Sequence, residues 1–249
     1  AYTAWWQKDS KLSAPKNSNL KTVMDFSFFD KINTAKNEQT ETWFKGLDRI
    51  YNNFVYDFLY PNPASVLAFI ENHDTDRFLG EGDNLPMLKQ ASTLLLTTRR
   101  IPQLYYGTEV MMNGVKSKSD GYVRKDFPGG WTGDATNALT PAGRTKIQNE
   151  CYDFYKTILN WRKGNDVIAK GSMVQFMVQN GVYAYARQYE GKTIFVMLNG
   201  TDAETTVPLK FYKEILKDSK QGKDILSGKA ITFGEELKMG PRESLVIEL

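Results

Sequence analysis

The chain has 249 residues, of which 41% are hydrophobic and 24% charged, a composition typical of a folded globular protein. The net charge is +3 with both signs mixed, which argues against nucleic acid as the main ligand because nucleic-acid-binding surfaces are usually strongly basic. No apolar run approaches the roughly 20 residues that a membrane-spanning helix needs. The single cysteine, Cys151, excludes an intramolecular disulfide.

The first two thirds of the chain alternate between strand patterns and helix patterns. Short apolar or alternating runs predict strands at 21–27, 65–71 and 101–106. Helical spacing and proline boundaries predict helices at 39–59, 85–99 and 141–162. Such alternation predicts an α/β fold with a parallel sheet and right-handed crossovers, either as an open sheet or as part of a barrel.

After residue 165 the pattern changes to short strands separated by hairpin turns. Strands are predicted at 173–179, 182–189, 193–199 and 243–249. Asn-Gly at 180–181 and Glu-Gly at 190–191 mark the turns between them. This part therefore predicts an antiparallel all-β module, and we expect two domains, 1–164 and 165–249.

Four polar residues, Glu71, Asn72, His73 and Asp74, lie at the carboxyl end of the second predicted strand. Residues just past the carboxyl end of a buried parallel strand face the active-site mouth of such folds. A histidine beside a carboxylate can bind substrate, transfer protons or ligate a metal, or it can be purely structural. A metal site needs several converging ligands, and this chain has one histidine and one cysteine far apart. The pattern therefore favours a substrate contact, with no metal and no cofactor.

The third predicted strand ends in a similar polar and aromatic group. Tyr105 and Tyr106 are followed by Glu109, so two aromatic rings and a carboxylate are expected at the same mouth. The alternative is that the tyrosines belong to the core and that Glu109 forms a salt bridge or caps a helix.

These stretches carry a family resemblance. Phe-x-x-Asn-His-Asp at 69–74 and Ile-Pro-Gln-x-Tyr-Tyr-Gly-x-Glu at 101–109 resemble the last two barrel-strand motifs of the α-amylase family, glycoside hydrolase family 13. The segment VMDFSFF at 23–29 resembles the sixth barrel strand, and residues 120–131 are similar to a loop of the neopullulanase and cyclomaltodextrinase branch. The resemblance implies the C-terminal part of a (β/α)8 TIM barrel, about strands six to eight, followed by an antiparallel β-sandwich.

The resemblance also implies roles for individual residues. The family consists of retaining glycosidases that use a nucleophilic and an acid/base carboxylate on α-1,4 and sometimes α-1,6 glucans. Asp74 matches a third catalytic carboxylate, which holds the hydroxyls of the sugar ring, and His73 matches a substrate-binding histidine. Asp120 and Arg124 match a pair that binds a more distant glucose, for which the planar guanidinium is suited.

Other residues are weaker candidates. Asn72 is expected to orient its neighbours, while Tyr106 and Glu109 are expected near the site. For Arg77 we favour a salt bridge with Asp76 or Glu81 over a functional role, and for Trp131 we favour packing within its loop.

The family motifs for the nucleophile, Gly-x-Arg-x-Asp, and for the acid/base, Gly-Glu after a buried strand, are not found in the sequence. We therefore expect a C-terminal portion of an enzyme acting on starch, pullulan or maltooligosaccharides, inactive alone. The alternative is a non-catalytic carbohydrate-binding or transporter-associated relative. Half a barrel exposes sheet edges, so the expected partner is the missing N-terminal half or a second copy of the chain. A periplasmic or cell-surface location is favoured over the cytoplasm. Bond preference, and hydrolysis versus transglycosylation, stay open.

Overall fold

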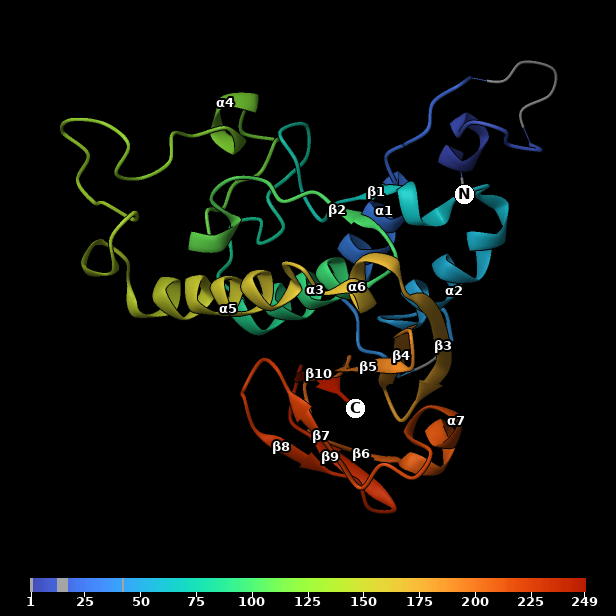
Figure 1. Ribbon diagram of the computed structural model, residues 1–249. Coiled ribbons are helices and arrows are strands. Elements are labelled where there is room, and N and C mark those ends of the chain that lie inside the picture. The colour runs from blue at the N-terminus through green and yellow to red at the C-terminus, as the bar shows by residue number, and fades with distance from the viewer. Residues whose placement is uncertain (1, 13–17, 42) are drawn as a thin grey trace.

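The computed structural model describes residues 2–12, 18–41 and 43–249. Figure 1 shows a helical part and a mostly β part that lie against each other. The α-helices of the described residues are α1 (Phe26–Ala35), α2 (Asp48–Val55), α3 (Leu85–Thr97), α4 (Asp120–Val123), α5 (Lys146–Arg162), α6 (Asp166–Lys170) and α7 (Lys213–Leu216). Short 3-10 helices are η1 (Tyr2–Trp6), η2 (Tyr56–Leu59), η3 (Pro63–Ser65), η4 (Thr108–Val110), η5 (Pro141–Gly143) and η6 (Leu209–Tyr212).

The strands are shorter in the first part of the chain than in the second. They are β1 (Leu67–Ala68), β2 (Ile101–Pro102), β3 (Ser172–Gln179), β4 (Val182–Tyr189), β5 (Lys192–Asn199), β6 (Thr205–Pro208), β7 (Gln221–Asp224), β8 (Ala230–Thr232), β9 (Glu236–Met239) and β10 (Ser244–Glu248). No helix within these described ranges is long and apolar enough to cross a membrane.

Three short segments run parallel in the first part. β1 pairs with β2 in parallel, and Met24 bridges to Leu67 on the other side of β1. The strand predicted at 21–27 is cut short because Asp25 caps α1, its Oδ1 accepting a hydrogen bond of 3.0 Å from the Phe28 amide. Side-chain capping therefore overrides the strand propensity of the aromatic residues that follow.

The helix predicted over 39–59 begins only at Asp48, while α3 forms close to its predicted range. Gly46 has a positive φ of 54°, and a Cβ there would lie 2.3 Å from Thr40 Oγ1. The Thr40 amide donates to the Gly200 carbonyl at 3.0 Å, which ties this loop to the β part. Periodicity alone does not reveal such a long-range tie.

The prediction of an antiparallel β module after residue 165 is confirmed. One sheet has the order β3-β4-β5-β10-β7-β8, and β6 pairs with β9 in a second sheet. The hairpin turns Asn180–Gly181 and Glu190–Gly191 have positive φ at both residues, as the favoured two-residue turns require. The sequence pattern did not predict the strands β6 to β9, each of which has four residues or fewer.

The central strands of the six-stranded sheet, β4, β5 and β10, are largely buried on both faces. On β4, Tyr183 and Tyr185 belong to the core shared with the helices, including Phe28. Their neighbour Ala184 belongs to a second core, with Val207 of β6. The two parts thus share a continuous core, and the division at residue 164 stays a prediction.

Candidate active site

The turn after β1 has two polar residues that are buried and two whose side chains are exposed to solvent. Glu71 and Asn72 are buried, whereas the side chains of His73 and Asp74 are 62% and 60% exposed. Asn72 Oδ1 accepts a hydrogen bond of 2.8 Å from the Asp74 amide, and the Asn72 amide donates to Thr75 Oγ1 at 3.0 Å. Asn72 therefore fixes the turn that presents the Asp74 carboxylate.

Four of the residues expected at the site lie together. His73 Nε2 is 3.2 Å from Asp74 Oδ2, and Arg124 Nη2 is 2.9 Å from Asp74 Oδ1. The same Arg124 nitrogen lies 3.3 Å from Asp120 Oδ2, and Arg124 Nε donates to the His73 carbonyl at 2.8 Å. We call His73, Asp74, Asp120 and Arg124 the His73–Arg124 cluster. It joins the turn after β1 to α4 and has both hydrogen-bond donors and acceptors at the surface.

Lys116 completes this surface and was missed from the sequence. Its Nζ donates to the Asp74 carbonyl at 3.0 Å and lies 3.6 Å from Asp120 Oδ1, while its amide donates to Asp76 Oδ1 at 2.5 Å. Ser119 caps α4, its Oγ accepting from the Tyr122 amide at 3.0 Å. The one available sequence signal was the spacing of four residues from Lys116 to Asp120.

A buried arginine supports the cluster from beneath. Arg77 is fully buried, and it donates to the Tyr106 carbonyl at 2.6 Å and to the Val123 carbonyl at 3.1 Å. Its guanidinium carbon lies 3.9 Å from the centre of the Tyr105 ring, a cation–π contact. Arg77 thereby links the turn after β1 to the end of the β2 segment and to α4.

The expected partners of Arg77 were wrong. Its ion pair is with Glu71, at 3.5 Å, rather than with Asp76 or Glu81. Glu81 instead pairs with Lys118 at 2.9 Å, and Asp76 binds the Lys116 amide. Sequence proximity suggested those partners, but the buried guanidinium selects the carboxylate that shares its enclosed surroundings.

Glu71 itself connects three segments. Its carboxylate accepts hydrogen bonds from the Phe78 amide and from Thr108 Oγ1. Burial raises the pKa of Glu71 above its usual value, and the hydrogen bonds and Arg77 only partly counteract this. Glu71 positions the turn rather than facing solvent, because only 2% of its side chain is exposed.

The aromatic and acidic residues after β2 have distinct surroundings. Tyr105 and Tyr106 are not in the core: their rings meet edge to face at 4.7 Å, and Tyr106 is 41% exposed with its hydroxyl donating to the Lys125 carbonyl. Glu109 lies in η4, partly buried, and forms no ion pair with any described residue.

Trp131 is 69% exposed, so the expected packing of its side chain within its loop was wrong.

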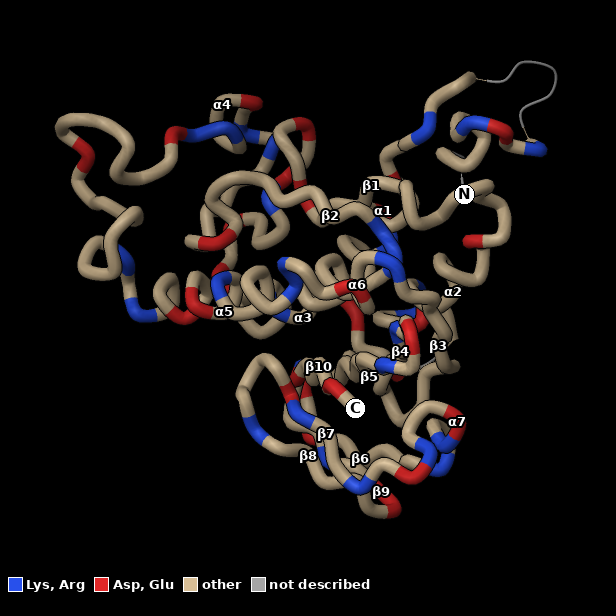
Figure 2. The backbone as a smooth tube through the Cα atoms, in the orientation of Figure 1, with Lys and Arg blue, Asp and Glu red and all other residues tan. Residues whose placement is uncertain are grey.

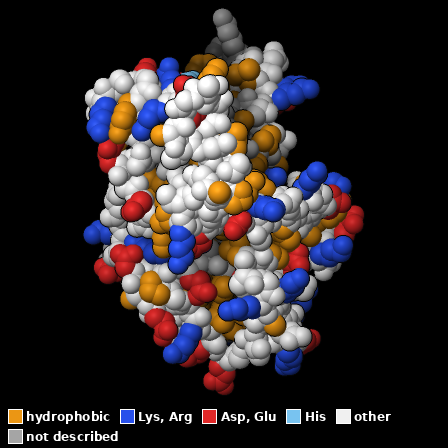
Figure 3. All heavy atoms as spheres, turned by 90° about the vertical axis from the view of Figure 1, so that its left-hand side faces the viewer, with side chains coloured by type: hydrophobic (Ala, Val, Ile, Leu, Met, Phe, Trp, Pro, Cys, Tyr) orange, Lys and Arg blue, Asp and Glu red, His pale blue; other side chains and the backbone are white. Residues whose placement is uncertain are grey.

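Charges of both signs are scattered along the whole backbone rather than gathered in a basic stripe (Figure 2). Figure 3 shows the same mixture on one face of the molecule, with apolar patches between the charged side chains. Within the described ranges no group of three or more His, Cys, Asp or Glu residues could hold a metal ion.

Comparison with known proteins places these residues in a family. Residues 173–248 match the family model of the cyclo-malto-dextrinase C-terminal domain. An α-amylase of Niallia circulans is 28% identical over 88% of this chain, and a cyclomaltodextrin glucanotransferase of Thermoanaerobacterium thermosulfurigenes is 30% identical over 84%. The chain is thus similar to the α-amylase family over most of its length. It spans 38% and 28% of the length of these two relatives.

Solved structures of the α-amylase family share the fold. An Anoxybacillus α-amylase aligns over 93% of this chain and 47% of its own, with a TM-score of 0.74 and 20% identity. An α-amylase from Geobacillus thermoleovorans, complexed with acarbose, aligns over 93% and 48%, with a TM-score of 0.73 and 20% identity. Both alignments include the helical part and the β part, so the α-amylase family fold extends through most of the chain.

Proposed function

We propose that this chain contributes a glucan-binding surface to an α-glucan-active enzyme of the α-amylase family. The observation that carries the proposal is the His73–Arg124 cluster, in which Asp74 contacts both His73 and Arg124. The carboxylate can accept hydrogen bonds from sugar hydroxyls, and the guanidinium and imidazole can donate them. Relatives named as α-amylase and cyclomaltodextrin glucanotransferase support this class of substrate.

Asp74 is proposed as the residue nearest the reacting sugar. An ionised carboxylate that binds two adjacent ring hydroxyls contributes most if these bonds tighten as the ring distorts towards its transition state. In the structure both of its oxygens already face cationic or potentially cationic partners. A bound sugar would therefore exchange some of these contacts for hydroxyl contacts, while Arg124 and His73 keep the carboxylate in its orientation.

The proposed architecture is the last three strand–helix units of a (β/α)8 barrel in residues 1–164, with a β-sandwich domain in 165–249. The parallel order of Met24, β1 and β2, with helices between them, supports it. In such a barrel the functional loops follow the carboxyl ends of the strands. The turn at 72–76 and the segment after β2 occupy those positions here.

We further propose a hydrolase of the neopullulanase type acting on starch, pullulan or maltooligosaccharides, with the nucleophile and the acid/base supplied from outside these residues. Among the described residues no strand pairs with the outer side of β2, where Ile101 and Leu104 are 42% and 37% exposed. Exposed sheet edges pair with other strands, so the rest of the barrel or a second copy is the proposed partner.

The function is tested by incubating this chain with maltoheptaose and measuring both binding and release of reducing ends. Binding without cleavage is the expected result. Cleavage by this chain would mean that the nucleophile and the acid/base lie within these 249 residues, and it would contradict the assignment. Absence of any binding would remove the proposed function.

A further inference from the structure

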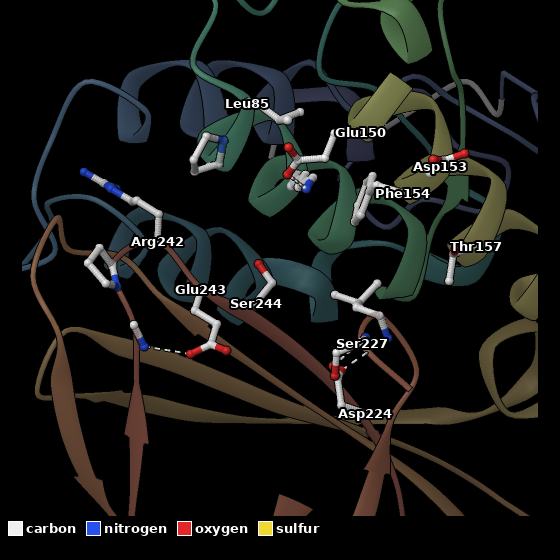
Figure 4. Close-up of a pocket in the computed structure, with 15 residues that line it drawn as sticks. Leu85, Glu150, Asp153, Phe154, Thr157, Asp224, Ser227, Arg242, Glu243 and Ser244 are labelled. Carbon is white, nitrogen blue, oxygen red and sulfur yellow. Dashed lines mark hydrogen bonds and ion pairs between the residues drawn. The ribbon is translucent and has the colours of Figure 1, made fainter. Parts of the chain in front are cut away.

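A second concave site lies away from the His73–Arg124 cluster, between the helices and the β part. Its volume is about 610 Å³, which is within the range of small-molecule sites, roughly 300–1,000 Å³. We call it the α5–β10 groove. It is defined by Leu85, Phe154, Thr157, Leu226, Glu243 and Ser244. Figure 4 shows α3 and α5 on one side and the β7 and β10 strands on the other.

Apolar side chains supply much of the wall. Phe154 projects from α5 towards the turn that follows β7, as Figure 4 shows. Leu85 at the start of α3 and Leu226 in that turn add aliphatic surface, and Pro241 adds a ring on the β side. Such a wall suits the apolar C–H face of a sugar ring.

The cations of the groove already have partners. Lys89 Nζ lies 2.6 Å from Glu150 Oε1, and Arg242 Nε lies 2.6 Å from Asp202 Oδ1. Asp224 is also occupied, because its oxygens accept from Ser227 and from the Val246 amide. The groove therefore offers no unpaired cation to an anionic ligand within the described residues.

Hydroxyl-binding groups remain around the rim and floor. Glu243 Oε2 accepts from the Gly240 amide at 2.7 Å, and in Figure 4 its second oxygen points along the groove. The Ser244 hydroxyl is enclosed and has no hydrogen-bond partner among the described residues, which is unfavourable for a buried polar group. Rotation about its Cα–Cβ bond can bring that hydroxyl to a ligand in the groove.

We propose that the α5–β10 groove binds one or two glucose rings of an α-glucan, as a second site outside the His73–Arg124 cluster. An uncharged ring with an apolar face and several hydroxyls matches apolar walls, carboxylate acceptors and a hydroxyl that lacks a partner. The choice of an α-glucan over another polyol rests on the proposed function, whereas the ring chemistry rests on the groove alone.

The experiment is a titration of the whole 249-residue chain with maltotriose, in which NMR measures the change of each amide chemical shift. The expected result is two groups of shifted amides, one at 72–76 and 120–124 and one around Leu226 and Ser244. Thr157→Trp fills the groove. We expect it to weaken the maltotriose affinity reported by the second group of amides at least about tenfold, equivalent to roughly 1.4 kcal/mol. Lys156→Trp is the matched control, because residue 156 is the neighbouring exposed position on α5 and does not line the groove.

Further variants separate the two sites and guard against misfolding. Asp74→Ala leaves the groove shifts intact. Ser244→Ala removes only a hydroxyl without a partner, and it weakens groove binding without lowering the melting temperature. Shifts confined to the His73–Arg124 cluster overturn the groove proposal and leave the proposed function standing. Shifts at neither site overturn both, and groove shifts that survive Thr157→Trp, or that glycerol reproduces equally, overturn the groove proposal alone.

Discussion

Arg124 Nη2 lies 2.9 Å from Asp74 Oδ1, although the two residues are far apart in sequence. This contact joins α4 to the turn after β1 and sets the orientation of the carboxylate. The exposed setting means that the pair contributes little to folding stability, about 0–1 kcal/mol. Its importance is therefore expected in sugar binding rather than in stability.

Substitution of Asp74 tests its catalytic role. In the enzyme that contains this chain, we expect Asp74→Ala to lower kcat about 100-fold or more, because charge and hydroxyl binding at the transition state are lost. The free energy of unfolding should change by no more than about 0.5 kcal/mol, as for other exposed positions. Near-normal kcat with a wild-type melting curve would contradict the role.

Arg77 is expected to matter for stability. Arg77→Ala removes one partner of a buried ion pair with Glu71, which costs about 3–5 kcal/mol when the other charge stays buried. Urea unfolding measures the loss. The matched control is Arg124→Ala, an arginine of the same site whose side chain is 40% exposed, for which we expect less than about 1 kcal/mol. Equal losses in the two variants would refute the distinction between them.

Arg187 connects the helical part to the β part. Its guanidinium donates to five carbonyls, those of Thr97, Thr98, Ile168, Gly171 and Ser172. Burial lowers the pKa of Arg187 to about 10, since none of these partners is a carboxylate. We expect Arg187→Met to cost at least about 3 kcal/mol because buried carbonyls lose their donors. Arg187→Lys should give an intermediate loss, and a loss below about 1 kcal/mol for Arg187→Met would be inconsistent with this account.

Glu38 gives a prediction for acid conditions. Arg49 donates two hydrogen bonds of 2.7 Å to its carboxylate, and this pairing lowers the pKa of Glu38 below 4.5. Because the pKa of Glu38 is lower in the folded than in the unfolded chain, the ionised carboxylate adds to the free energy of unfolding above pH 4.5. This contribution is lost as the pH falls through the folded-state pKa. Glu38→Gln should therefore be less stable at pH 7 by about 1–2 kcal/mol, and the difference should shrink below pH 4.5. A difference that is constant with pH in urea titrations would exclude this linkage.

The sequence predicted elements wherever local pattern and packing agree. α3 and the hairpins of β3, β4 and β5 form close to their expected ranges because periodicity and turn glycines point the same way. The late start of α2 at Asp48 could not be predicted, because the hydrogen bond from Thr40 to Gly200 depends on a segment far along the chain. β6 to β9 are too short for alternation to be visible.

The candidate site was predictable to a similar degree. A motif resemblance brought His73 and Asp74 together with Asp120 and Arg124, and the structure places them in contact. The pairing of Arg77 with Glu71 was not predictable, since burial decides it and burial follows from the tertiary fold. Lys116 was missed because its only signal, the spacing of four residues to Asp120, is weak in a polar loop that has many charged residues.

The most direct test of the central claim is calorimetric titration with maltotriose of Thr157→Trp, which isolates the His73–Arg124 cluster, and of the same variant carrying Asp74→Ala. We predict that the first protein binds and that Asp74→Ala weakens the remaining binding at least about tenfold. Equal binding by the two proteins, with both folded by circular dichroism, would contradict the assignment of the His73–Arg124 cluster as the glucan-binding site.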